Sequence, residues 1–257
     1  MGCGASKVGS DDAVIAPGGV KPLLAMKFDN TELSSVDVVF QSADRLNKQM
    51  EKLNDGLTKS VDNVIKSCGN PNSGLKDAIT STLSLLTPEA AKLVAKQVAS
   101  APALDKLLSS GTIVFEMPTG DAIVDALLGC PGVDKATAER VRAIMDMVPS
   151  IVSITNETLP AILQELTTLQ EKAKTMGQDM SNPEKLKSMA IEAGLIGNNP
   201  MSDGMKVVNL AKTLKNNVQS CVDKLPKNSK IVADNITSTC TAVVDAFNAS
   251  KADIKAQ

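Results

Sequence analysis

The sequence predicts an all-α protein, a multi-helix bundle, from three observations. Apolar residues recur at spacings of three and four along most of the chain, which is the period of one helix face. Proline and glycine interrupt this pattern at intervals that fit helices of ordinary length. Aromatic residues are nearly absent: the 257 residues include four Phe and no Trp or Tyr. That composition disfavours sheets built on aromatic cross-strand pairs.

The first expected helix is long and amphipathic, and it covers residues 32–67. Apolar side chains form one stripe along it, and lysines and aspartates occupy the opposite face. Thr31 or Ser34 can cap its start, and Gly69 ends it before an Asn-Pro pair. At 1.5 Å per residue, such a helix is roughly 50 Å long.

Shorter helices follow, several of them with proline in the first turn. They are expected at residues 75–86, 88–100, 102–111, 120–129, 134–147, 150–176 with a kink at Pro160, 183–194, 203–225 and 229–254. Residues 112–117 have β-like composition, but a lone strand has no partner, so an extended connector is expected there. We expect one helical domain over residues 28–257, with possible internal boundaries near 101–118 and 195–204.

The amino terminus carries the clearest functional pattern. Removal of Met1 leaves Gly2 with a free α-amino group, and Ser6 supplies the hydroxyl of the M-G-x-x-x-[ST] pattern. Cys3 places a thiol beside the new acyl chain. These seven residues resemble the openings of dually acylated eukaryotic membrane-anchored proteins. The resemblance implies N-myristoylation at Gly2 and S-palmitoylation at Cys3, with Ser6 and Lys7 recognised by the acyltransferase.

A second membrane signal is needed, because one myristoyl chain gives only marginal, reversible binding. Residues 1–27 contain three lysines and two aspartates, which is no polybasic patch. Palmitoylation of Cys3 is therefore the expected second signal. Glycines and prolines in residues 8–27 disfavour regular structure, so we expect residues 1–27 to be an acylated, flexible tether.

Other targeting signals do not compete with this interpretation. The chain has no basic segment followed by an apolar signal core, and no apolar stretch long enough to span a bilayer. Its five cysteines are odd in number and show no C-x-x-C pair, which indicates reduced thiols. The expected location is the cytoplasmic face of a membrane, whether plasma, flagellar or internal.

Catalytic patterns are missing from the sequence. The absence of histidine excludes Ser-His-Asp triads, Cys-His dyads and imidazole metal ligands. Cys68, Cys130, Cys221 and Cys240 fall at or near apolar helix positions, so buried thiols are expected rather than nucleophiles. Phosphate-binding and nucleophile-elbow motifs are also absent. We therefore expect no enzyme, no cofactor and no metal.

Residues 127–141 resemble a helix-hairpin-helix, a DNA-binding motif whose glycine-rich turn offers backbone N–H groups to a phosphate. Pro131, Gly132 and Val133 fit the family pattern, but Asp134 stands where the family has its second glycine. Residues 101–170 hold four basic and nine acidic residues, opposite to the footprint of a DNA-binding surface. Nucleic-acid binding is therefore a minor alternative.

The sequence therefore predicts a non-enzymatic, lipid-anchored peripheral membrane protein, a helical scaffold or adaptor with an unidentified protein partner. A second hypothesis is a carrier of lipid or another apolar ligand. Five methionines could line its cavity, although methionine more often fills gaps in a core: Met176, Met180, Met189, Met201 and Met205. The oligomeric state is left open.

Overall fold

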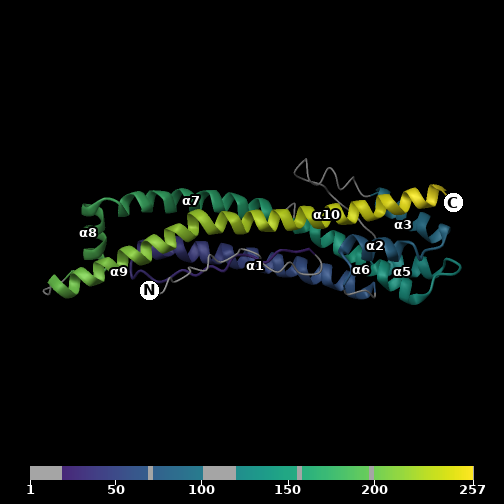
Figure 1. The fold of residues 1–257 in the computed structure, drawn as a ribbon, viewed down its shortest axis with the longest axis horizontal. Helices are drawn as coiled ribbons and strands as arrows, with labels where there is room; N and C mark the ends of the chain where they lie inside the picture. The colour runs from purple at the N-terminus through teal and green to yellow at the C-terminus, as the bar shows by residue number, and fades with distance from the viewer. Residues whose placement is uncertain (1–18, 69–71, 101–119, 155–157, 197–199, 257) are drawn as a thin grey trace, which may run out of the picture.

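The computed structural model describes residues 19–68, 72–100, 120–154, 158–196 and 200–256. It is 82% helical, and the described residues contain no strand. The predicted all-α multi-helix bundle is therefore confirmed. The helices are arranged as an elongated rod, with the long helices along its length (Figure 1).

Two long parallel helices form the frame of the rod. The first is α1, Ser34–Ser67, which matches the helix expected over residues 32–67. The second consists of α9, Pro200–Gln219, a π-turn η2, Ser220–Lys224, and α10, Leu225–Ala256, which follow one another without interruption. Both frame helices start toward the same end of the rod (Figure 1).

The continuity of α9, η2 and α10 differs from the sequence prediction, which placed a break between residues 225 and 229. Pro226 lies in that interval, and proline lacks an N–H while its ring clashes with the carbonyl four residues earlier. In the structure the wider π-turn η2 ends just before Pro226, and the helix continues through it. A π-turn of this kind accommodates an irregularity without ending the helix.

The remaining helices occupy the two ends of the rod. At one end lie α7, Leu159–Met180, and α8, Pro183–Glu192. At the other end lie four helices: α2, Leu75–Leu83, α3, Pro88–Ser100, α5, Gly120–Leu128, and α6, Lys135–Ser153 (Figure 1). The expected helix 102–111 and connector 112–117 lie outside the described residues.

The helix predicted over residues 150–176 with a kink at Pro160 falls on two described helices. Helix α6 continues through Pro149 as far as Ser153, and α7 begins at Leu159; residues 155–157 lie outside the described residues. Pro160 lies in the first turn of α7. There its missing N–H is no loss, because the first N–H groups of a helix have no partner within the helix.

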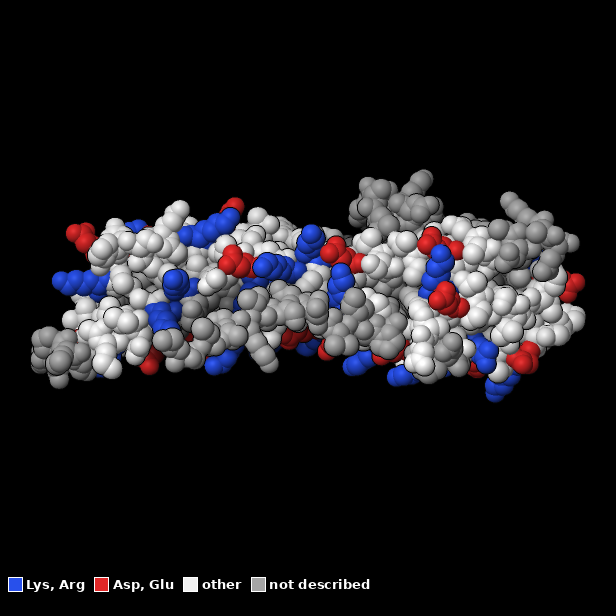
Figure 2. Space-filling view, in the orientation of Figure 1, with Lys and Arg blue, Asp and Glu red and all other residues white. Residues whose placement is uncertain are grey.

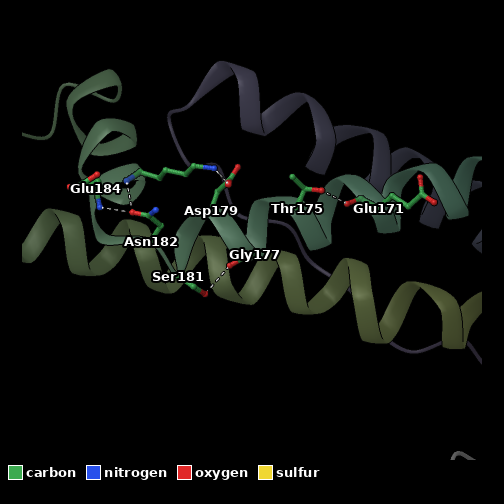
Figure 3. Close-up of polar contacts among 8 residues, drawn as sticks. Glu171, Thr175, Gly177, Asp179, Ser181, Asn182 and Glu184 are labelled. Carbon is green, nitrogen blue, oxygen red and sulfur yellow. Dashed lines mark hydrogen bonds and ion pairs between the residues drawn. The ribbon is translucent and has the colours of Figure 1, made fainter.

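The corner between α7 and α8 is closed by local polar contacts (Figure 3). Asn182 caps α8: its Oδ1 accepts hydrogen bonds from the backbone N–H groups of Glu184 at 2.9 Å and Lys185 at 3.4 Å. The Lys185 ammonium forms an ion pair with Asp179 in the last turn of α7. The Ser181 hydroxyl donates to the Gly177 carbonyl at 3.1 Å. These contacts fix the direction in which α8 crosses the end of the rod.

Candidate functional site

An extended segment lies along the two frame helices, and we call it the strap, residues 19–30. It is neither helix nor strand, yet Val20 is only 4% exposed. The sequence analysis placed residues 19–27 in a flexible tether because of their glycine and proline content. The structure instead packs these residues on the bundle.

Five buried asparagines hold the strap, and we call them the asparagine clamp. All five are at most 6% exposed, and they come from α1, α9 and α10: Asn47, Asn54, Asn217, Asn228 and Asn235. Unpaired amides buried at this depth would cost free energy, so each needs hydrogen-bond partners.

Three clamp residues each bind both backbone polar groups of one strap residue. Asn235 accepts from the Lys21 N–H at 3.0 Å and donates to the Lys21 carbonyl at 2.9 Å. Asn228 accepts from the Leu24 N–H at 2.7 Å and donates to the Leu24 carbonyl at 3.0 Å. Asn217 accepts from the N–H of Asp29 at 3.1 Å and donates to its carbonyl at 2.7 Å. The side-chain amides thus take the place of a neighbouring β-strand.

The two clamp residues on α1 accept hydrogen bonds from the clamp residues Asn228 and Asn235 on α10. Asn228 donates to Asn47 Oδ1 at 2.9 Å, and Asn235 donates to Asn54 Oδ1 at 2.8 Å. Asn54 also donates to the Lys21 carbonyl at 3.1 Å. These contacts join α1 to α10 beneath the strap and hold the α10 amides in one orientation.

The spacing of the clamp fits the spacing of an extended chain. Asn47 and Asn54 are seven residues apart, as are Asn228 and Asn235, and seven helical residues advance about 10.5 Å. Three residues of extended chain advance about 9–10 Å. Strap residues three apart therefore meet clamp residues seven apart, and the strap runs antiparallel to both frame helices.

Apolar strap side chains add packing to this polar contact. Leu23, Met26 and Phe28 are partly buried against the core. The Phe28 ring stacks on Phe40 of α1, with centroids 6.2 Å apart and the planes 15° from parallel. The strap is therefore anchored by main-chain hydrogen bonds and by the packing of these apolar side chains.

The strap joins α1 through a tight turn. The backbone N–H and hydroxyl of Thr31 both donate to Asp37 Oδ1, at 2.9 and 2.7 Å. Asn30 Oδ1 accepts from the Glu32 N–H at 2.9 Å. Glu32 has a φ of 63°, and it is the one non-glycine residue in the described part of the chain with a positive φ. The turn is thus held by side chains while its backbone is strained.

The sequence analysis missed the asparagine clamp, although a signal for it exists. Asn47 and Asn54 lie on the otherwise apolar face of α1, and Asn228 and Asn235 lie likewise on α10. A polar residue repeated at a seven-residue interval on a buried face indicates a specific buried partner. Local patterns alone do not show what that partner is.

The predicted lipidation residues Gly2, Cys3, Ser6 and Lys7 lie outside the described residues. The nearest described part of the chain is the start of the strap at Gly19. Whether the amino terminus is acylated is therefore not addressed by the fold, and it stays a prediction.

The segment that resembles a helix-hairpin-helix does join two helices, α5 and α6, through a short turn. Gly132 takes a φ of +82° in that turn, where a side chain would be strained. Asp134 caps α6 by accepting from the Thr137 N–H at 2.7 Å, and this backbone hydrogen bond lowers the pKa of its carboxyl. The carboxylate occupies the helix N-terminus where a phosphate would bind.

The arginine side chain beside this turn is surrounded by carboxylates. Arg142 pairs with Asp121 at 2.9 Å, with Asp146 at 3.5 Å and with Glu139 at 3.6 Å. Three acidic partners leave this guanidinium poorly placed for a nucleic-acid phosphate, because binding would require separating those pairs.

The cysteine side chains described are mostly structural. Cys221 and Cys240 are 0% and 1% exposed, and burial raises the pKa of their thiols to about 12 and about 11. Cys68 is half-buried, and burial raises its thiol pKa although Thr82 donates to its sulfur at 2.9 Å. Thiolates, the reactive form, are thus disfavoured at all three positions.

The methionines suggested as a cavity lining have different surroundings. Met176, Met180 and Met189 pack partly buried against the core, whereas Met205 is 72% exposed. Met180 borders an open groove between α7 and α9. The Met201 side chain is not among the side chains that the structure describes.

No protein-family model matches the chain, and neither a curated protein nor a solved structure is significantly similar to it. Among the described residues, no helix combines the length and apolarity needed to cross a bilayer. The same residues contain no group of three or more acidic or cysteine side chains arranged to hold a metal ion.

Proposed function

We propose that this chain is a non-enzymatic, lipid-anchored peripheral membrane protein that serves as a helical scaffold or adaptor at the cytoplasmic leaflet. The observation that carries the proposal is the opening of the sequence. Gly2, Cys3 and Ser6 together fit N-myristoylation followed by S-palmitoylation. The membrane could be the plasma membrane, a flagellar membrane or an internal one.

The strap supports this proposal by defining where an anchor would attach. Gly19 lies seventeen positions after Gly2, and a chain of that length spans at most roughly 60 Å when fully extended. The first clamped residue, Lys21, is held between α1 and α10. An acyl chain at the amino terminus would therefore leave the flank of the rod, and it would keep the body within that distance of the bilayer.

The surface of the rod carries charges of both signs (Figure 2). On the face shown in Figure 2, basic and acidic side chains are interspersed along the rod. Lysines of α9 and α10 such as Lys212, Lys215 and Lys230 are exposed. We propose no nucleic-acid partner, because Asp134 and the carboxylates around Arg142 oppose a phosphate.

The test is the membrane-bound fraction of four forms of the full chain in eukaryotic cells. Gly2→Ala removes the myristoyl acceptor and should release the protein to the soluble fraction. Cys3→Ser leaves one marginal acyl chain and should make the protein mostly soluble or spread over internal membranes. Lys7→Ala removes one charge, worth about 1 kcal/mol at most, and should change little.

Metabolic labelling with alkyne analogues of myristate and palmitate gives an independent readout of the same variants. Gly2→Ala should lose both labels, and Cys3→Ser should lose only the palmitate label. Wild type should therefore be retained most, followed by Lys7→Ala, Cys3→Ser and Gly2→Ala. A Gly2→Ala protein that stays on membranes would place the anchor in the helical body and contradict the proposal.

The alternative of an apolar-ligand carrier rests on the open groove between α7 and α9. Met180, Val218 and Val222 contribute apolar surface there, beside polar and charged neighbours. Native mass spectrometry of the purified chain distinguishes the two functions. A retained lipid that is lost on Val218→Asp would favour the carrier.

A further inference from the structure

The asparagine clamp binds the strap mainly through its main chain; the one strap side chain that a clamp amide contacts is Met26, whose sulfur lies 3.4 Å from Asn228 Nδ2. Its contacts with Lys21, Leu24 and Asp29 use only their N–H and carbonyl groups. Lys21 as a whole is exposed. Contacts of this kind depend on an extended backbone, so they form equally well with a strap from another molecule.

Backbone strain in the turn between the strap and α1 favours release of the strap. Glu32 has a φ of 63°, and this left-handed conformation is disfavoured roughly 5- to 30-fold at a residue other than glycine. The side chains of Asn30 and Asp37 hold the turn closed. Straightening the chain at Glu32 would release the strain and carry the strap away from its own clamp.

We propose that the asparagine clamp is a peptide-binding site that also takes the strap of a second copy of this chain, by reciprocal exchange of residues 19–30 about Glu32. Each clamp in the dimer makes the same contacts that it makes in the monomer, and both turns are straightened. The proposal is independent of the lipid anchor and concerns the helical body alone.

The balance between monomer and exchanged dimer follows from two opposing factors, provided that each Thr31 re-forms its hydrogen bonds to Asp37 across the dimer. A strap joined by a short turn has an effective concentration in the millimolar range, which favours the closed monomer. Releasing the Glu32 strain in two copies favours the dimer by roughly 30- to 1,000-fold. The expected dissociation constant is therefore micromolar to tens of micromolar.

Sedimentation equilibrium of the unacylated full chain tests the exchange. Wild type should be largely dimeric at roughly 100 µM, which is above the expected dissociation constant. Glu32→Gly should weaken the dimer by roughly 30-fold or more, because glycine adopts a positive φ without strain. A double variant with Lys21→Pro and Leu24→Pro should not dimerise, since proline at each position lacks the N–H that donates to the clamp.

Ala25→Pro is the matched control, because Ala25 is exposed and its N–H is not bound by the clamp asparagines. This variant should dimerise like wild type. A wild-type chain that remains monomeric after refolding at the same concentration would overturn the proposal, as would a Glu32→Gly variant that dimerises equally well.

A labelled peptide spanning residues 19–30 tests the site directly. It should bind the full chain carrying Lys21→Pro and Leu24→Pro at least tenfold more tightly than wild type or Ala25→Pro, whose clamps are already occupied. Circular dichroism of the double variant checks that its helices are intact. No binding to the folded double variant would overturn the site, and peptide binding without wild-type dimerisation would overturn exchange between copies.

Discussion

Replacing Asn228 with alanine should destabilise the protein by removing several hydrogen bonds at once. The Asn228 amide bonds to the Leu24 N–H, to the Leu24 carbonyl and to Asn47 Oδ1. Each such bond contributes about 0.5–1.5 kcal/mol net, so the expected loss is about 2–4 kcal/mol in the free energy of unfolding. Asn217→Ala removes two bonds to Asp29 and should cost about 1–3 kcal/mol.

A double-mutant cycle identifies the strap as the source of this loss. Leu24→Pro removes the N–H that Asn228 accepts, and alone it should cost about 1 kcal/mol. In the Asn228→Ala background that hydrogen bond is already absent, so Leu24→Pro should cost close to nothing. The expected coupling energy between the two positions is therefore about 1 kcal/mol. Ala25→Pro serves as the control and should add to Asn228→Ala without coupling.

Urea unfolding followed by circular dichroism at a helix band is the suitable assay. Tryptophan fluorescence is not available, because the chain has no Trp. Equal m-values among the variants would show that only stability changed. Additive effects of Asn228→Ala and Leu24→Pro would refute the reasoning, since they would mean that the clamp does not hold the strap.

Three further predictions concern other parts of the structure. Glu32→Gly should stabilise the monomer by about 1 kcal/mol, seen as a higher urea midpoint at low protein concentration, whereas a lower midpoint would deny the strain at its positive φ. The Asp134 carboxyl has a lowered pKa in the folded state, so its cap stabilises α6 at pH values above the ordinary Asp pKa, and this stabilisation is lost as pH falls through the folded-state pKa. Asp134→Ala should therefore reduce the loss of stability at acid pH. A loss of stability at acid pH equal to that of wild type would argue against the cap. Iodoacetamide at about pH 8 should leave Cys221 and Cys240 unmodified in the folded chain, because their thiol pKa values are about 12 and about 11, and rapid alkylation detected by mass spectrometry would contradict their burial.

Periodicity was sufficient to predict the helices because each depends on residues close together in sequence. The apolar stripe of α1 fixed both its extent and its buried face. The differences from the prediction lie near prolines. Pro149 and Pro226 are accommodated inside helices, the latter after the π-turn η2, and Pro160 lies in the first turn of α7. A proline marks an irregularity in the backbone, but the surrounding packing decides which kind.

The strap could not be predicted from local sequence, because its order depends on distant residues. Lys21 is bound by an asparagine 214 positions away, and Leu24 by one 204 positions away. Glycine and proline correctly excluded a helix for this segment, but they do not distinguish a free chain from one held in an extended conformation. The amides at seven-residue spacing on buried helix faces carried that information.

Amide hydrogen exchange measured residue by residue across the strap tests the central claim most directly. If the asparagine clamp holds the strap, the N–H groups of Lys21, Leu24 and Asp29 exchange slowly, while that of the exposed Ala25 exchanges faster. Asn228→Ala should then speed exchange at Leu24 in particular. Uniform exchange of all strap amides at the rate of an unstructured peptide would contradict the account.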